Sequence, residues 1–309
     1  MAAPGTGYVD LQVNGYAGVD FNSDDLAADA LHAACERLEA DGNAGVLATF
    51  ITDEVERMCA RIARLVRLRE EDETVRRLII GVHIEGPFLN ENPGWIGAHP
   101  PACVRPADGE SMRRLLDAAG GLARIVTLAP ERDPGMATTR FVAGQGIVVA
   151  AGHCDPSLEQ LAAGIDAGLS MFTHLGNGCP QMLERHDNII MRVLSLADSL
   201  RICFIADGVH VPYVALGSYL RLAGTENSIV VTDAIAAAGL GPGRYRFGAR
   251  EIEVDEHLTA RVPGNYTHLA GSAITMPHSV GNLRDVVGLG GDEIRRLTSE
   301  NPRRLLEAG

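Results

Sequence analysis

The sequence predicts an α/β fold in which eight parallel strands close into a (β/α)₈ barrel, also called a TIM barrel. Apolar runs rich in β-branched residues recur along the 309 residues, and amphipathic helical segments separate them. Eight such strand–helix units fit within about 250 residues, the typical length of a closed barrel. An open doubly wound sheet is the alternative, but no G-x-G-x-x-G turn follows the first strand. No linker or low-complexity segment interrupts the pattern, so residues 1–309 are expected to form one domain.

The predicted strands are short apolar segments that end in glycine or polar residues. They cover residues 8–15, 45–53, 78–87, 124–130, 146–154, 169–177, 201–210 and 228–236. The segment 241–270 breaks the pattern, and its alternation of polar and apolar residues predicts a hairpin inserted after the eighth strand. Two further helices, near 276–289 and 291–308, are expected to complete the barrel.

Helical segments are expected between the strands, for example over 53–72. Ser23, followed by two acidic residues, predicts the start of the first helix, which would stop near Gly42. The segment 155–168 likewise has a capping residue at its start and Gly168 after its end.

Composition and charge exclude several function classes. The formal net charge of −13 argues against a surface for nucleic acid or for an anionic membrane, although an anionic small substrate needs only a local group of cations. No apolar run is long enough to span a bilayer, and the first residues do not resemble a secretory signal. The six cysteines form no C-x-x-C pair, which is typical of a reduced, cytoplasmic protein.

Polar side chains gather where the predicted strands end, and a (β/α)₈ barrel carries its chemistry at that rim. In the third strand, His83 and Glu85 are two residues apart and therefore point to the same face. Burying an ionised carboxylate without a partner is costly, so a cation is expected beside Glu85. The other strands end in Gln12 and Asn14, His153, His174 and Asn177, Asp207 and His210, and Asp233.

Glu85, His153 and His174 together offer one oxygen and two nitrogens to a borderline cation such as Zn²⁺. Three protein ligands with an open position are typical of a catalytic metal site, where the metal lowers the pKa of water and polarises a carbonyl. Fe²⁺, Mn²⁺ and Co²⁺ can use the same ligands. Asp233 would then act as general base and acid, and its alternative role is that of a turn or helix N-cap residue.

A family resemblance rests on six motifs in order: "GVHIEGPF" with "GAHP", "AGHCDPS", "THLGNGCP", "IADGVHVP", "VTDAIAAAG" and "LAGSAITM". From about Tyr8 to Leu306 the sequence resembles the N-acetylglucosamine-6-phosphate deacetylases of the amidohydrolase superfamily. The resemblance implies that Glu85, His153 and His174 hold the metal and that Asp233 is the acid/base. It also implies that His99 and His210 bind the amide and sugar of the substrate, with Asn177 nearby. Ser272, in "LAGSA", is expected to pack the loop.

The first strand decides how many metal ions are expected. Most amidohydrolases have a His-x-His pair there, which holds a second metal, whereas this chain has Gln12 and Asn14. Amides are poor ligands for a borderline cation beside imidazole, so one tightly held metal ion is predicted.

Three departures from the family concern the substrate and the assembly. Gly176-Asn177-Gly178-Cys179 stands where the family has an aromatic residue, Asn and Ala-Met, which would open room near the metal. Arg185 resembles the phosphate contact of the family but precedes an altered His186-Asp187-Asn188, and a surface or dimer-interface ion pair is its alternative role. Most of the family's accessory β-domain is expected to be missing, so a partner subunit or the closing helices would cover the barrel, and a homodimer is predicted.

The sequence therefore predicts a metal-dependent deacetylase that hydrolyses the acetamide of an N-acetyl amino sugar, with N-acetylglucosamine-6-phosphate as the expected substrate. An amidohydrolase acting on another amide is one alternative: an N-acetyl sugar without phosphate, a cyclic amide or an N-acyl amino acid. A catalytically silent barrel that binds a sugar phosphate is the other.

Overall fold

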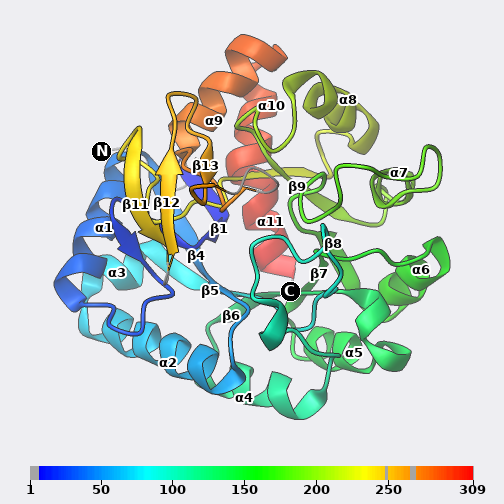
Figure 1. Ribbon diagram of the computed structural model, residues 1–309, viewed down its shortest axis with the longest axis horizontal. Helices are drawn as coiled ribbons and strands as arrows, with labels where there is room; N and C mark the ends of the chain where they lie inside the picture. Colours follow the sequence, from blue (N-terminus) through cyan, green and yellow to red (C-terminus); the bar gives the residue numbers. More distant parts are fainter. Residues whose placement is uncertain (1–6, 248–249, 265–268, 309) are drawn as a thin grey trace.

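The computed structural model describes residues 7–247, 250–264 and 269–308. Its centre is an eight-stranded sheet in which each strand pairs in parallel with the next strand of the sheet (Figure 1). The strands are β1 (Tyr8–Val13), β4 (Asn43–Ile51), β5 (Ile79–Glu85), β6 (Ala123–Leu128), β7 (Val148–Ala151), β8 (Leu169–Phe172), β9 (Arg201–Ile205) and β10 (Ser228–Val231).

Contacts between the first and the last strand close this sheet into a barrel. A parallel bridge joins Val13 to Ala234, just beyond the end of β10. Below it, the side chain of Asp10 in β1 accepts hydrogen bonds from the hydroxyl (2.6 Å) and the backbone N–H (3.2 Å) of Thr232. The predicted (β/α)₈ barrel is therefore confirmed, and each of its eight predicted strands is present.

The strands nevertheless end earlier than the sequence predicted. The prediction extended β7, β8 and β10 through His153, His174 and Asp233, respectively. These three residues have φ angles of 50°, 32° and 51°. A left-handed backbone cannot continue a β-ladder, so each strand stops before its polar residue.

Helices surround the barrel, as Figure 1 shows in a view along its axis. They are α1 (Ala28–Ala40), α2 (Val55–Glu71), α3 (Glu73–Leu78), α4 (Gly109–Ala119), α5 (Ala137–Ala143), α6 (Leu158–Asp166), α7 (Ile189–Ser195) and α8 (Tyr213–Ala223). The closing helices are α9 (Met276–Asn282) with the π-turn η4 (Leu283–Val287), and α10 (Gly291–Arg295), η5 (Arg296–Glu300) and α11 (Asn301–Ala308). Short 3₁₀ turns lie at η1 (Pro101–Cys103), η2 (Pro130–Arg132) and η3 (Pro134–Met136).

The predicted helix caps had mixed outcomes. At α6, Ser157 and Gln160 form a reciprocal capping box, so the predicted start of this helix is confirmed. At α1 the prediction was wrong, because the helix begins at Ala28 after an N-cap residue, Ala27, that makes no side-chain cap. The hydroxyl of Ser23 instead accepts a hydrogen bond from the N–H of Asp25 (3.2 Å) in the turn before the helix.

Two apolar layers hold the barrel together. Alternate residues of the strands face the helices, and the others fill the interior, where Leu11, Leu47, Ile125, Met171 and Val231 belong to one buried cluster. No helix in the described part of the chain has the length and apolar character needed to cross a membrane.

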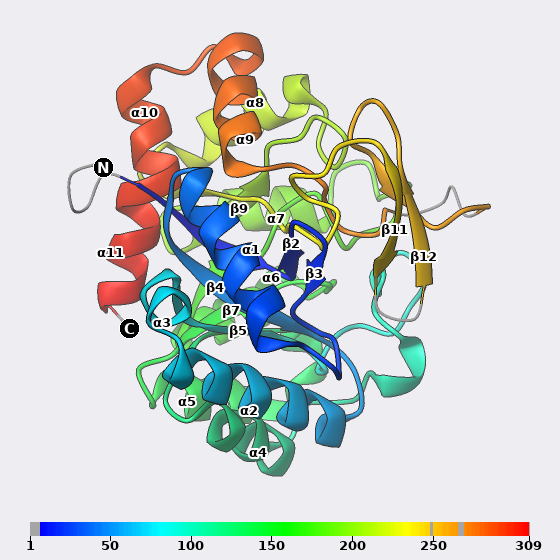
Figure 2. The ribbon, with the colours of Figure 1, turned by 90° about the vertical axis from the view of Figure 1, so that its left-hand side faces the viewer.

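A small antiparallel sheet, formed by β11 (Gly243–Phe247), β12 (Arg250–Val254) and β13 (Ala260–Arg261), follows the eighth strand. It confirms the predicted hairpin and adds a third strand. Figure 2 shows β11 and β12 at the end of the barrel that lies away from both chain termini. Ile252, Val254 and Ala260 pack on Ile235 and Ala273, which fixes this sheet beside the barrel rim. A two-stranded hairpin, β2 (Gly15–Tyr16) and β3 (Val19–Asp20), lies after β1.

Candidate active site

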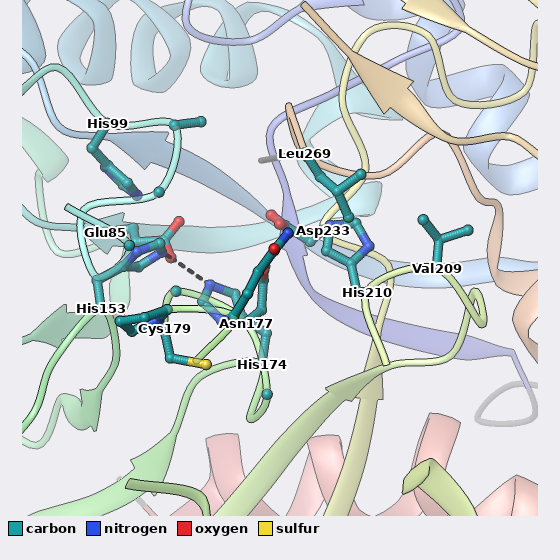
Figure 3. A pocket seen from close by; sticks show the side chains of 18 of the residues that line it. Glu85, His99, His153, His174, Asn177, Cys179, Val209, His210, Asp233 and Leu269 are labelled. Atoms are coloured by element: carbon teal, nitrogen blue, oxygen red, sulfur yellow. Dashed lines mark hydrogen bonds and ion pairs between the residues drawn. The ribbon is translucent and has the colours of Figure 1, made fainter. Parts of the chain in front are cut away.

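A cavity of about 550 Å³ opens at the carboxyl ends of the barrel strands. Glu85, His153, His174 and Asp233 line it, each at or just after the end of a different strand. The left-handed backbones of His153, His174 and Asp233 cost free energy for non-glycine residues, and such conformations cluster at functional sites. Figure 3 shows these side chains directed toward one another.

Glu85 is the centre of this group and is almost completely buried. Its Oε1 lies 3.0 Å from Nε2 of His174 and 3.3 Å from Nε2 of His153. Its Oε2 accepts a hydrogen bond from the side-chain amide of Gln12 (3.1 Å). Burial favours the neutral acid, but the hydrogen bonds with the two imidazoles outweigh it and hold the pKa of Glu85 well below its ordinary value.

The hydrogen bonds of the imidazoles determine which nitrogen can hold a metal. Nδ1 of His153 lies 2.9 Å from the carbonyl oxygen of Trp95 and must donate its proton there, so a neutral ring keeps its Nε2 lone pair facing Glu85. Nε2 of His174 also faces Glu85, and among described residues its buried Nδ1 has no partner. Burial lowers the pKa of His174, but the contact with Glu85 outweighs it and raises the pKa overall.

A second possible ligand set includes His99 in place of His174, because Glu85, His99 and His153 each offer a ligand atom within 4.8 Å of the others. The backbone N–H of Thr52 donates to Nδ1 of His99 (3.4 Å), and the Thr52 hydroxyl lies 2.9 Å from the same nitrogen. Thr52 therefore engages Nδ1 in either tautomer of His99: Nδ1 accepts from the N–H, or it donates to the hydroxyl, which itself donates to the carbonyl of Glu85 (3.4 Å). Burial and the neighbouring His153 lower the pKa of His99 to about 3, so its ring is neutral. His99 and His174 are therefore the two candidates for the third ligand.

Asp233 lies on another part of the cavity wall (Figure 3). Its Oδ1 accepts a hydrogen bond from the side-chain amide of Asn14 (2.7 Å), and its carbonyl accepts one from the N–H of Ser272 (3.1 Å). The loop packing predicted for Ser272 thus includes a direct contact with the Asp233 backbone. Burial and the negative charge of Glu85 raise the pKa of Asp233 to about 6. No described helix starts directly after Asp233, so the alternative role as a helix N-cap does not apply.

Gln12 and Asn14 make contacts that the sequence did not predict. Each donates from its amide nitrogen to one of the two acids, Gln12 to Glu85 and Asn14 to Asp233. Their amide oxygens, Oε1 and Oδ1, are buried and have no hydrogen-bond partner among the described residues. Gln12 and Asn14, at the end of β1, therefore orient both carboxylates.

His210 and Asn177 line the same cavity as Glu85 and Asp233. Nδ1 of His210 lies 2.5 Å from a carboxylate oxygen of Asp207, whose other oxygen accepts the N–H groups of Val209 and His210. Burial would raise the pKa of Asp207, but His210 and these hydrogen bonds lower it overall. The sequence placed Asp207 at the rim without a role, and the structure shows that it orients His210.

The glycines around Asn177 let their loop approach the metal-site residues closely. Gly178 has a φ of 61°, and a Cβ added there would lie 2.7 Å from Nδ1 of His153. The space expected from these glycines is therefore partly taken up by the approach of the loop itself. Arg185, later in the same segment, is exposed and is not among the described residues that line the cavity.

Comparisons with known proteins agree with this architecture, although no family model matches the chain. The chain is 31% identical over 302 residues to an N-acetylglucosamine-6-phosphate deacetylase of Bacillus subtilis (strain 168), covering 97% of this chain and 74% of that protein. It is 28% identical over 299 residues to an N-acetylgalactosamine-6-phosphate deacetylase of Escherichia coli O157:H7, covering 97% of this chain and 77% of that protein.

A solved structure of a deacetylase is also similar to this chain. A variant of the N-acetyl-D-glucosamine-6-phosphate deacetylase of Mycobacterium smegmatis, in complex with N-acetyl-D-glucosamine-6-phosphate, superposes with a TM-score of 0.87. That match has 31% identity and covers 98% of this chain and 77% of that chain. The sequence motifs, the barrel and both comparisons agree, and the chain belongs to the N-acetylglucosamine-6-phosphate deacetylase family.

Proposed function

We propose that this chain is a metal-dependent deacetylase that hydrolyses N-acetylglucosamine-6-phosphate to glucosamine-6-phosphate and acetate. The observation that carries the proposal is the group of Glu85, His153 and His174, which shares one cavity with the buried acid Asp233 in a member of this family. The related deacetylases act on 6-phosphorylated N-acetyl sugars, as their names state.

One divalent cation, with Zn²⁺ favoured, fits the donor set. Glu85 supplies a carboxylate oxygen, Oε1, and Nε2 of His153 and Nε2 of His174 both face this oxygen. When bound, such a cation would polarise the acetamide carbonyl and make water more acidic. Gln12 and Asn14 use their amide nitrogens on the two acids, which supports one tightly held ion rather than two.

The residues that line the cavity then have separate roles in the reaction. Ionised Asp233 accepts a proton from the attacking water and returns it to the amide nitrogen, so the C–N bond breaks with a neutral amine leaving. Asn14 holds that carboxylate in place through its 2.7 Å hydrogen bond. His99, with its proton on Nε2, would donate to the carbonyl oxygen of the acetamide, and His210 and Asn177 would contact the sugar.

We also propose a cytoplasmic homodimer. The six cysteines are all free, which supports a reducing compartment. Met182 and Val214 are apolar side chains that are 88% and 87% exposed, which supports a contact with a second copy of the chain. Light scattering of the purified protein tests the dimer.

The decisive experiment measures acetate release by zinc-loaded protein from N-acetylglucosamine-6-phosphate, N-acetylgalactosamine-6-phosphate and unphosphorylated N-acetylglucosamine. The proposal expects the highest kcat/KM with the first substrate. A higher kcat/KM for N-acetylgalactosamine-6-phosphate would make that sugar the proposed substrate. Activity on unphosphorylated N-acetylglucosamine alone would show that the substrate carries no phosphate. If none of the three releases acetate, the deacetylase proposal fails, and a panel of cyclic amides and N-acyl amino acids tests the alternative.

A further inference from the structure

The backbone around His153, a proposed metal ligand, is held by the segments that follow β5 and β6. The φ of 50° at His153 is unfavourable for a residue other than glycine, so the surrounding structure must fix this conformation. The carbonyl of His153 accepts a hydrogen bond from the N–H of Asn90 (3.0 Å). Two residues further along the chain, the N–H of Asp155 donates to Oε1 of Glu131 (2.7 Å). The turn that carries the imidazole is therefore held at both of its ends.

Asn90 uses its backbone and both ends of its side chain in this arrangement. Its Nδ2 donates to the same Oε1 of Glu131 (2.9 Å), which ties the two holding residues together. Its Oδ1 accepts the N–H of Asn92 (3.0 Å), whose carbonyl accepts the N–H of Trp95 (3.1 Å). The carbonyl of Trp95 lies 2.9 Å from Nδ1 of His153. Hydrogen bonds from Asn90 thus lead to both the backbone and the ring of His153.

Glu131 lies at the centre of these contacts, although it is not among the described residues that line the cavity. Its Oε1 accepts two hydrogen bonds, whereas its Oε2 is buried and has no hydrogen-bond partner in the described part of the chain. Burying an oxygen without a partner costs free energy. The two contacts of Oε1 offset this cost, and both of them lead to His153.

We infer that Glu131, acting through Asn90 and Asp155, is a positioning residue that holds His153 in the orientation needed to bind the metal. The inference rests on the proposed function and deepens it, because it names a residue outside the cavity that sets the metal affinity of the site. The partners of a metal-binding imidazole fix its tautomer and orientation, and their loss typically costs about 10- to 100-fold in metal affinity or activity. Glu131 acts one step further out, on the backbone of His153 and on the loop whose carbonyl faces Nδ1.

The test measures zinc affinity and stability as separate quantities. Competition with a chromogenic chelator gives the Kd for zinc, and thermal unfolding of the zinc-free protein gives Tm. Glu131→Met keeps the approximate size of the side chain but removes both carboxylate oxygens, and it is expected to raise the Kd for zinc about 10-fold or more. Glu131→Gln keeps an acceptor at Oε1, so its Kd should stay within about twofold of wild type. Its amide nitrogen is buried without a partner, which should lower Tm.

Three further variants make the result specific. Asn90→Ala removes the amide between Glu131 and the loop, and it should also raise the Kd for zinc, which keeps the inference testable if Glu131→Met does not fold. Glu91→Met removes an exposed acid of the same segment, whose partner is Arg132 (3.1 Å), and should leave the Kd unchanged. In a His153→Gln background, adding Glu131→Met should change the Kd by less than about twofold, because the positioning acts through the imidazole.

A purely structural role for Glu131 gives a different pattern. If Glu131→Met lowers the Tm of the zinc-free protein but leaves the Kd for zinc at the wild-type value, the inference is overturned. It is equally overturned if Glu131→Gln weakens zinc binding as much as Glu131→Met does, because the charge rather than the hydrogen bonds of Oε1 would then be responsible.

Failure of the proposed function gives a different result from failure of this inference. If no acetylated sugar releases acetate but the Kd for zinc still depends on Glu131, the positioning role stands and the deacetylase activity is wrong. If acetate is released and Glu131→Met binds zinc as tightly as wild type, the activity stands and the role of Glu131 is wrong.

Discussion

Asp233 is the residue whose surroundings most directly set the chemistry. It is buried, faces the same cavity as Glu85, and receives one amide hydrogen bond from Asn14. Replacing it with Asn keeps the size of the side chain and removes the group that transfers protons. Asp233→Asn is therefore expected to lower kcat at least 10³-fold, toward the upper end of the usual range for a general acid/base. Zinc content, measured by mass spectrometry of the metal, should stay at the wild-type level, and near-normal turnover would contradict the assigned role.

The pKa of Asp233 also predicts a pH dependence. Burial and the charge of Glu85 raise this pKa from 3.8 to about 6, and a cation held beside Glu85 would bring it lower. The general base must be ionised, so kcat/KM is expected to fall as pH drops through about 6 or below, with a slope of one on a logarithmic scale. Steady-state kinetics between pH 4.5 and 8, at steps of roughly half a pH unit, would measure this fall in kcat/KM. An acid limb with a midpoint above 7 would contradict the assignment.

Asp10 provides a stability prediction away from the chemistry. Burial raises its folded-state pKa from 3.8 to about 7, so the folded protein holds this proton more tightly than the unfolded chain. That contribution to stability is complete at low pH and is lost as pH rises toward 7 and beyond. Between pH 5.5 and 8 the loss is about 2 kcal/mol. Urea unfolding at both pH values should show that Asp10→Asn lacks this decrease, and an unchanged pH dependence would show that Asp10 does not titrate in this way.

At the level of elements, we predict that the residues at the end of strand β1 limit the site to one metal ion. Gln12 and Asn14 each donate to an acid and leave a buried amide oxygen without a described partner. The double variant Gln12→His with Asn14→His replaces these weak ligands by imidazoles. We expect it to bind a second equivalent of zinc, measured by metal analysis after equilibrium dialysis, while wild type keeps one. Asn14→Ala with Gln12→Ala is the matched control, because it removes the amides without supplying ligands. A second tightly bound ion in wild type would contradict the role of these amides.

The strands were predictable because buried parallel strands are mostly apolar and rich in β-branched residues. Most of the eight show this pattern, whereas β8 (Leu169–Phe172) is apolar without a β-branched residue. The ends of the strands were not predictable, because local pattern does not reveal that His153, His174 and Asp233 adopt left-handed backbones. The residues at the rim were predictable for a related reason. A closed barrel forces strand ends together, so Glu85, His153 and His174 are neighbours although 89 residues separate the first from the last.

The contacts around those residues could not be predicted from the sequence. Nδ1 of His99 contacts Thr52, which lies 47 residues away in the chain, and no local pattern indicates this contact. Asp207 orients His210 through a short local turn that resembles many Asp-Gly turns of no functional importance.

At the level of the whole molecule, the barrel brings the proposed metal ligands together at the ends of β5, β7 and β8. Glu85 already accepts a hydrogen bond from Gln12 and contacts His153 and His174, and the surrounding core is extensive. Chelator-treated protein is therefore expected to stay folded, with wild-type far-ultraviolet circular dichroism. Zinc at 100 times its Kd should add about 2.7 kcal/mol, because it binds the folded state alone, and this raises Tm by several degrees.

The variants separate specific binding at this site from a general effect of zinc on the protein. Glu85→Gln removes the anionic ligand and should abolish the zinc-dependent rise in Tm. Asp233→Asn changes an acid of the same cavity that is not assigned as a ligand, and it should retain the rise. His99→Gln should also retain it, because the proposed role of His99 is to donate to the acetamide rather than to hold the metal. If His99→Gln loses the rise in Tm and His174→Gln keeps it, the third ligand is His99, and the ligand set would have to be reassigned on that evidence.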